Sequence, residues 1–151
     1  MEDPALQVSM SECRLIYRSL STDEFVSNET VKDIAEKGAK NNKDQHITGL
    51  LVLSGNQFLQ VLEGPTPEVN ALFHKISVDE RHSNVHLLHY ELIQERQFQE
   101  WSMRLVDLWD IPGNVREFIR SKYICIEDVI QIPTDPMVVH ALLLDALALS
   151  R

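Results

Sequence analysis

The sequence has few of the residues that mark several classes of protein. Only two of its 151 residues are cysteines, Cys13 and Cys125, and they lie far apart without the short spacing of a metal site. They indicate reduced thiols rather than a disulfide framework. No apolar run approaches the roughly 18–20 residues that cross a bilayer, and the start MEDPALQVSMSE lacks the basic and apolar parts of a signal peptide. We therefore expect a cytoplasmic protein with no membrane partner.

Basic residues are also scarce. Fourteen Lys and Arg stand against 23 Asp and Glu, which gives a formal net charge of −9. No cluster of basic residues is available to displace counterions from a phosphate backbone, so we expect no nucleic-acid partner. What remains is an ordinary globular composition, with 44% apolar and 25% charged residues. The length is enough for one domain with its own core.

The apolar pattern predicts seven elements in the order strand, helix, strand, strand, helix, strand, strand. The expected strands are 13–19, the two arms of the hairpin HITGLLVLSGNQFLQVLEG around Ser54-Gly55-Asn56, 85–93 and 101–108. The expected helices are about 28–41 and the segment from Pro67 that carries Val69, Leu72, Phe73 and Ile76 on one face. This order is typical of an α+β fold, a ferredoxin-like βαββαββ sheet with two helices on one face.

Two more helices, 114–122 and 136–149, are predicted in the C-terminal part of the chain. The last one, MVVHALLLDALAL, is apolar on nearly all sides but too short to span a membrane. We expect it to bury against the other face of the sheet or against a partner chain, which predicts a homo-oligomer. The expected organisation is a flexible leader at 1–11, a domain at 12–108 and a helical extension at 109–151.

No phosphate-binding Gly-rich loop, zinc-protease motif or CxxC pair is present. His86 and His89 share one predicted strand, but their odd spacing places them on opposite faces, so no metal site is expected. Gln60 is the most unusual polar residue, because it stands between Leu59 and Val61 in an apolar strand. A buried amide has up to four hydrogen bonds to fill, and an unsatisfied one costs about 1–3 kcal/mol.

Other polar or adaptable side chains lie inside apolar elements too: Tyr17 in the first strand, Asn41 and Asn42 at the end of the first helix, and Trp101 and Met103 on one face of the last strand. Singly, each has an ordinary structural explanation as a core tyrosine, a helix cap or a gap filler. Together they predict a pocket for a flat heterocycle with a polar edge. Ile34 and Ile76 would cover its two faces, and Arg81 with His82 would meet a phosphate or ring substituent.

Four stretches of the chain resemble the BLUF family of blue-light sensors that use FAD. They are RLIYRS, AKNNKDQHITGLLVLSGNQFLQVLEG, DERH and WSMRLVDL, in the order and spacing of the family, and they cover roughly residues 12–108. Each is weak evidence alone, but together they are specific. The resemblance implies a photosensory signalling protein rather than an enzyme. It also implies a non-covalent FAD, with FMN or riboflavin as alternatives, and a downstream effector protein of unknown identity.

The resemblance also assigns roles by position. Tyr17 corresponds to the tyrosine that donates an electron and a proton to the excited flavin, and Gln60 to the glutamine between that tyrosine and the flavin, whose hydrogen bonds rearrange in light. The other implied residues are Asn41 and Asn42 at the ring carbonyls and N3, Ile34 and Ile76 on the ring faces, Arg81 and His82 on the outer side of the flavin, and Trp101 and Met103 in signal transmission. Gly38 departs from the larger or polar residue that many relatives carry.

Three alternative interpretations remain at this point. One is a ferredoxin-like acylphosphatase-type hydrolase, for which Arg18 is the only arginine near the first strand able to serve a phosphate-binding loop. Another is an interaction module without flavin. The third is a photosensory fragment of a larger light-regulated cyclase or phosphodiesterase. The apolar, non-basic ending favours a complete small protein, since the ~40 residues after the domain cannot hold an enzymatic output domain.

Overall fold

The computed structural model describes residues 11–22, 28–99 and 102–149, except for the side chains of residues 28–31, 33 and 34. Two of the predicted site residues are affected by these limits. Trp101 lies outside the described residues, and so does the side chain of Ile34. The predicted leader, 1–11, is outside them except for its last residue.

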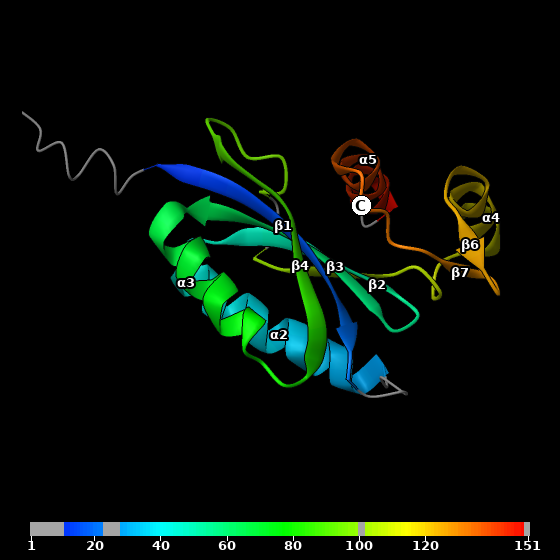
Figure 1. Ribbon diagram of the computed structural model, residues 1–151, viewed down its shortest axis with the longest axis horizontal. Helices are drawn as coiled ribbons and strands as arrows, with labels where there is room; N and C mark the ends of the chain where they lie inside the picture. The colour runs from blue at the N-terminus through cyan, green and yellow to red at the C-terminus, as the bar shows by residue number, and fades with distance from the viewer. Residues whose placement is uncertain (1–10, 23–27, 100–101, 150–151) are drawn as a thin grey trace, which may run out of the picture.

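Five strands form one mixed sheet in the order β4–β1–β3–β2–β5 (Figure 1). The strands are β1 (Glu12–Ser21), β2 (Thr48–Ser54), β3 (Gln57–Pro65), β4 (His82–Ile93) and β5 (Arg104–Asp107). All neighbours are antiparallel except β2 and β5, which run parallel. Two helices, α2 (Asn28–Asp44) and α3 (Thr66–Ser77), lie on one face of the sheet (Figure 1). The predicted α+β ferredoxin-like sheet with two helices on one face is confirmed.

The alternation of side chains along the strands decides what each face of the sheet holds. Tyr17 of β1 lies opposite Gln60 of β3, and both belong to the face under α2 and α3. The next pair, Ile16 and Val61, belongs to the other face. The predicted hairpin turn is confirmed, with Gly55 at φ +59° between β2 and β3, in the left-handed region that glycine adopts without steric cost.

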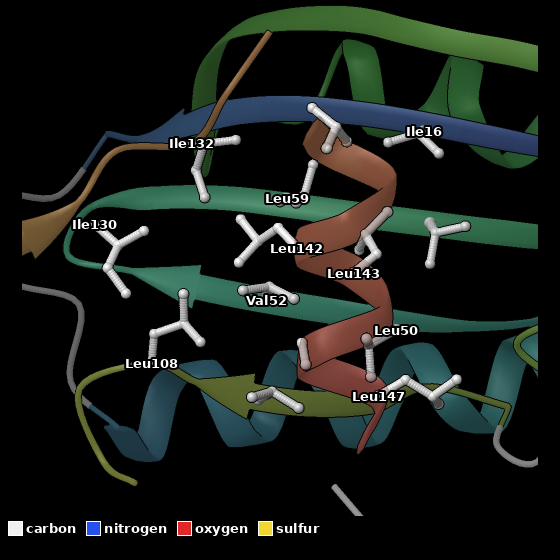
Figure 2. Packing of buried hydrophobic residues seen from close by; sticks show 14 of the residues in the cluster. Ile16, Leu50, Val52, Leu59, Leu108, Ile130, Ile132, Leu142, Leu143 and Leu147 are labelled. Carbon is white, nitrogen blue, oxygen red and sulfur yellow. The ribbon is translucent and has the colours of Figure 1, made fainter. Parts of the chain in front are cut away.

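The face away from α2 and α3 is filled by α5 (Pro136–Leu149), which lies across the central strands (Figure 2). The buried side of α5 consists of Val139, Leu142, Leu143, Ala146 and Leu147. These residues join one core with the outward residues of β2 and β3, among them Leu50, Val52 and Leu59. Of the two positions expected for this helix, the one against the other face of the sheet is confirmed. In the part of the chain that the structure describes, no helix is both long and apolar enough to cross a bilayer.

The other predicted C-terminal helix, 114–122, is also confirmed, as α4 (Gly113–Lys122). Between the two helices lies a small hairpin that the sequence pattern did not predict, β6 (Cys125–Ile126) and β7 (Val129–Ile130). Strands of two residues are too short to show a hydrophobic period. The tip of the β2–β3 hairpin holds this region: Ser54 Oγ donates to the Ile130 carbonyl at 2.5 Å, and the Ile132 amide donates to Gln57 Oε1 at 3.1 Å.

Several predicted boundaries were wrong, and the reasons are local. Helix α2 continues to Asp44 instead of ending near residue 41, and it stops before His46, whose φ is +60°. Asn41 and Asn42 therefore belong to its last turn. The last strand begins at Arg104 rather than 101, so Met103 precedes β5. Strand β4 begins at His82, three residues earlier than predicted, since β1 extends to Ser21 and pairs with it there.

The prediction that His86 and His89 lie on opposite faces was also wrong. The register between β1 and β4 shifts between Ile16 and Tyr17. Because of this irregularity, His86 lies opposite Arg18 and His89 lies opposite Ile16, and these two residues of β1 share a face. Both histidines therefore belong to the α5 face. Among the described residues, no group of three or more His, Cys, Asp or Glu is placed to hold a metal ion.

Candidate functional site

A cavity of about 370 Å³ lies between the sheet and the two helices α2 and α3. Its lining includes eight residues that were predicted for the site: Tyr17, Asn41, Asn42, Gln60, Ile76, Arg81, His82 and Met103. They come from β1, α2, β3, α3, β4 and the segments that flank the strands. The fold thus brings to one cavity residues that are spread over 87 positions of the sequence, from 17 to 103.

A chain of three side chains forms the base of the cavity. The hydroxyl of Tyr17 donates to Gln60 Oε1, and Gln60 Nε2 donates to Met103 Sδ at 3.3 Å. Tyr17 is 3% exposed and Gln60 is 8% exposed, so the hydrogen bond between them is shielded from water, whereas the one to Met103 is only partly buried. A thioether sulfur is a weak acceptor. The amide nitrogen of Gln60 is therefore a donor that a carbonyl or ring nitrogen would satisfy better than Met103 does.

The buried position of Tyr17 also fixes its protonation state. Burial raises the pKa of the Tyr17 phenol above its ordinary value, and the negative charge of Asp79 raises it further. The phenol is therefore neutral at physiological pH and keeps the proton that it donates to Gln60. The ring packs against Phe73 of α3, with the two centroids 5.6 Å apart. This packing holds the hydroxyl toward the amide.

The two asparagines at the end of α2 take different positions. Asn42 is 3% exposed, and its Nδ2 donates to the Ser102 carbonyl at 3.0 Å. Its backbone carbonyl accepts the amide of Ile47 at 2.8 Å, which closes the end of the helix. Asn41 lines the cavity but is exposed. Asn42 thus ties α2 to the segment just before β5, and Asn41 presents an amide at the opening.

His82 and Arg81 stand at the rim. His82 Nε2 lies 2.6 Å from the Ile76 carbonyl, which can only accept, so this nitrogen carries a hydrogen. Its Nδ1 lies 2.9 Å from Ser19 Oγ. Arg81 pairs with Asp79, with Nη2 and Oδ2 2.5 Å apart. The hydrogen bonds from Arg81 lower the pKa of the Asp79 carboxyl to about 2, so it is ionised at neutral pH.

Several lining residues were not predicted as site residues: Lys37, Gly38, Leu51, Phe58, Leu72 and Lys75. The alternation of β3 places Phe58 on the same face of the sheet as Gln60. Its ring lies edge-on to His82, with the centroids 6.5 Å apart. Leu62, on the same face of β3, lies in the core under α3 and does not line the cavity. A Cβ added at Gly38 would meet nothing within 4 Å.

The cavity has the chemical character of a site for a flat, mostly apolar ligand with a polar edge. Its volume lies within the roughly 300–1,000 Å³ that is usual for small-molecule sites. Leu51, Leu72 and Ile76 supply apolar walls, whereas the amides of Gln60 and Asn41 supply donors and acceptors. A flavin ring, with its hydrocarbon end and its carbonyl-bearing end, fits this division.

Residues 13–104 match the family described as BLUF, sensors of blue-light using FAD. The chain belongs to the BLUF family. Members of this family are blue-light sensors that bind a flavin. Arg18, on which the hydrolase interpretation depended, lies on the α5 face of this BLUF domain, where its Nη1 donates to the Ile132 carbonyl at 3.4 Å. It therefore lies away from the cavity.

A curated relative agrees with this membership. The chain is 36% identical over 97 residues to the blue light- and temperature-regulated antirepressor BluF of Escherichia coli (strain K12). The match covers 62% of this chain but 23% of the E. coli protein. The chain thus spans about a quarter of the length of that relative.

Solved BLUF structures extend the similarity to the C-terminal region. The ground state of BlsA matches with a TM-score of 0.74 and 28% identity, over 90% of this chain and 87% of that chain. A Klebsiella pneumoniae protein, BlrP1, solved with FMN and cyclic diGMP, matches with a TM-score of 0.65 and 28% identity. That match covers 89% of this chain and 35% of that chain.

Proposed function

We propose that this protein is a blue-light photoreceptor that binds FAD non-covalently in the cavity and signals to a partner protein by contact. The observation that carries the proposal is the chain Tyr17–Gln60–Met103, which joins a buried phenol to the segment before β5 through one amide. Membership of the BLUF family supports the choice of flavin. In this proposal residues 12–108 form the flavin-binding domain and residues 109–151 a helical extension.

Seven residues would hold the flavin. Gln60, Asn41 and Asn42 would meet the polar edge of the ring, Ile34 and Ile76 would cover its faces, and Arg81 with His82 would lie on its outer side. Asn42 already donates one amide hydrogen to Ser102, so it offers its remaining hydrogen and its oxygen. FMN and riboflavin are the alternative ligands, and the FMN bound to the K. pneumoniae relative favours keeping FMN in the comparison.

When bound, the flavin supplies absorption of blue light and, once excited, a strong electron acceptor. Tyr17 would give up one electron and, by way of Gln60, its hydroxyl proton, and would then take both back, so there is no net oxidation. The burial that keeps Tyr17 protonated keeps this proton available. Gln60 would be left rotated or tautomerised, with its hydrogen bonds rearranged, and this change beside the flavin would shift the absorption to the red.

Rotation of Gln60 changes its hydrogen bond to Met103, because one end of the amide donates and the other accepts. Met103 Sδ accepts a hydrogen from Gln60 Nε2, and a thioether has no hydrogen to donate to an amide oxygen. Turning the amide therefore breaks this contact. In the proposal, Met103 and Trp101 pass the change to β5 and the extension, where two arrangements differ in population between dark and light.

The first test is spectroscopic. The purified protein should be yellow, and blue light should shift its flavin absorption reversibly to the red. Tyr17→Phe should keep the flavin, since the ring packing is unchanged, but lose the photocycle. A colourless protein that binds none of FAD, FMN and riboflavin would reject the proposed function, and a normal photocycle in Tyr17→Phe would reject Tyr17 as the donor.

The partner surface is proposed on the C-terminal extension. Phe118, Ile124, Ile126 and Met137 expose apolar side chains there, and they make a contact between copies of this chain, or with an effector, favourable. We expect a homo-oligomer by light scattering at micromolar concentration. A monomer in both dark and light would contradict this part of the proposal.

A further inference from the structure

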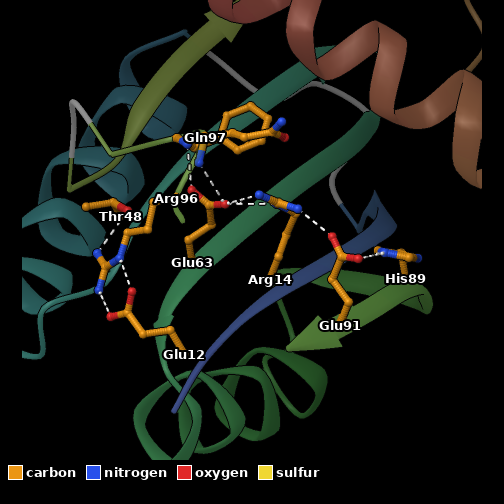
Figure 3. A network of polar contacts seen from close by, with 9 residues as sticks. Glu12, Arg14, Thr48, Glu63, His89, Glu91, Arg96 and Gln97 are labelled. Atoms are coloured by element: carbon orange, nitrogen blue, oxygen red, sulfur yellow. Dashed lines mark hydrogen bonds and ion pairs between the residues drawn. The ribbon is translucent and has the colours of Figure 1, made fainter. Parts of the chain in front are cut away.

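We propose that the buried carboxylate of Glu63 is a positioning residue that anchors the segment before β5 and couples that segment to α5. The inference rests on the proposed function, because the coupling matters only if light moves the residues after this segment. Glu63 lies on the face of β3 opposite the cavity, three residues after Gln60. It belongs to a polar network that crosses β1, β3 and β4 beside α5 (Figure 3).

Glu63 is 0% exposed and both of its carboxylate oxygens accept hydrogen bonds. Oε1 accepts the backbone amide of Phe98 at 2.5 Å, and Oε2 accepts that of Gln97 at 3.1 Å. Oε2 also faces Arg14 of β1, whose Nε and Nη2 lie 2.8 and 2.7 Å away. A buried carboxylate needs such a set of donors and one positive charge. Glu63 therefore fixes the backbone of two loop residues to the centre of the sheet.

Two further contacts support this anchor. Arg14 also pairs with Glu91 of β4, which holds the guanidinium from its other side (Figure 3). In the loop itself, Arg96 pairs with Glu12 of β1 and donates to Thr48 Oγ1 of β2 at 3.2 Å. The stretch 96–98 is thus tied to β1, β2 and β3 by charged hydrogen bonds, which are the stronger kind.

Residues of the cavity bind the same segment again at residues 102 and 103. Ser102 accepts the amide of Asn42, and Met103 accepts that of Gln60. The chain between Phe98 and Ser102 is therefore held at both ends, by Glu63 on the α5 face and by site residues on the cavity face. A change at Gln60 loosens only the second of these holds. With the backbone of Phe98 held at Glu63, the change would then reach α5 through the ring of Phe98 and would not be absorbed by movement of the loop.

Phe98 connects this anchor to α5. Its side chain is 1% exposed and belongs to the core that α5 completes. Its ring lies edge-on to His140 of α5, with the centroids 6.5 Å apart and the planes at 79°. Burial lowers the pKa of His140, and the positive charge of Arg14 lowers it further, so the ring is neutral when it packs on Phe98. The backbone of Phe98 is held by β3 while its ring touches the helix.

Amide hydrogen exchange in dark and blue light tests both parts of the proposal in the full chain with flavin bound. In Glu63→Gln, exchange of peptides over 94–99 should speed up by at least about tenfold in the dark, because charged hydrogen bonds to two amides are weakened. The amplitude of the flavin red shift should stay as in the wild type, because Tyr17 and Gln60 are untouched. The light-minus-dark difference over 136–149 should be lost.

His140→Ala tests the coupling without disturbing the buried charges. Its dark exchange over 94–99 should stay within about twofold of the wild type, whereas its light-minus-dark difference over 136–149 should be lost. The control is Glu117→Gln, which removes the same charge from α4 at a side chain 74% exposed. It should change neither measurement.

Unchanged dark exchange over 94–99 in Glu63→Gln would overturn the anchor. A wild-type light difference over 136–149 in His140→Ala would overturn the coupling, as would a wild-type protein that shows the red shift but no light difference in α5. Absence of the red shift in the wild type would instead reject the proposed function, and the dark exchange measurement would still decide whether Glu63 anchors the loop.

Discussion

The two faces of the sheet are built from the same strands, but one is covered by a packed apolar core and the other borders a cavity. Under the middle of α5 the alternating side chains of the strands are apolar and closely packed, and residues such as Leu50 and Val52 are 0% exposed (Figure 2). The ion pair of Arg14 and Glu63 lies beside this core. Under α2 and α3 the alternate set includes Tyr17 and Gln60 around a cavity of about 370 Å³. One face provides close packing, and the other leaves space lined by hydrogen-bonding groups.

The difference indicates that one face of the sheet serves mainly stability and the other mainly ligand binding. Close packing contributes most of the stability of a domain, so the α5 face is expected to govern the free energy of unfolding. Polar groups in a cavity contribute less to stability but determine what can bind there. Substitutions on the two faces should therefore separate stability from photochemistry.

The largest effect on the free energy of unfolding is expected on the α5 face. Leu143→Ala removes a fully buried side chain and should lower the free energy of unfolding by about 2–5 kcal/mol. Leu144→Ala, one residue along the same helix, removes a side chain that is 40% exposed and should cost less than about 1 kcal/mol. Urea unfolding followed by circular dichroism measures both. Equal losses of free energy of unfolding in the two variants would show that packing on the α5 face does not govern stability.

A smaller change in stability, of opposite sign, is expected on the face under α2 and α3. Gly38 lies within α2, and a methyl group there would meet open space. Gly38→Ala should therefore raise the stability of the flavin-free protein by about 0.5–1 kcal/mol, the gain from replacing glycine in a helix. Gly113→Ala, at the start of α4 where a Cβ is equally free, should gain less. Loss of stability in Gly38→Ala would mean that this part of the cavity is filled.

The smallest effect is expected at the rim of the cavity. Arg81 lowers the pKa of Asp79 from 3.8 to about 2, so the ionised carboxylate is favoured in the folded state. The resulting stability is complete above the unfolded pKa and is lost as the pH falls through the folded one. It amounts to at most about 1 kcal/mol, because Arg81 is largely exposed and solvent screens the pair.

Asp79→Asn should therefore be slightly less stable than the wild type at pH 7 and equal to it near pH 2. Urea unfolding at pH 7, 4 and 2 gives the comparison, with Glu80→Gln at the next, exposed position as control. A difference between Asp79→Asn and wild type that grows toward low pH would have the wrong sign for this explanation.

The fold was largely predictable because its signals are local. The hairpin around Gly55 and the apolar face of α3 follow from turn chemistry and period alone. Features that depend on pairing between distant strands were not predictable. The register shift beside Ile16, which brings His86 and His89 to one face, is an example. So is the two-stranded β6–β7, which is too short to carry a period.

The site was predictable to the extent that polar residues interrupt apolar elements. Gln60 and Tyr17 stood out in this way, and they are hydrogen-bonded to each other. Phe58 did not stand out, because an aromatic residue in a strand looks the same whether it packs in a core or lines a cavity. The role of Glu63 was not predictable either, since its partners Gln97 and Phe98 lie more than thirty residues away in sequence.

The absorption of Gln60→Leu under blue light tests the central claim most directly. Leucine has nearly the volume of glutamine but neither accepts from Tyr17 nor donates to Met103. The variant should bind FAD, and its spectrum should show none of the light-induced red shift that the wild type shows. A Gln60→Leu protein that binds FAD and gives the full, reversible red shift would contradict the account.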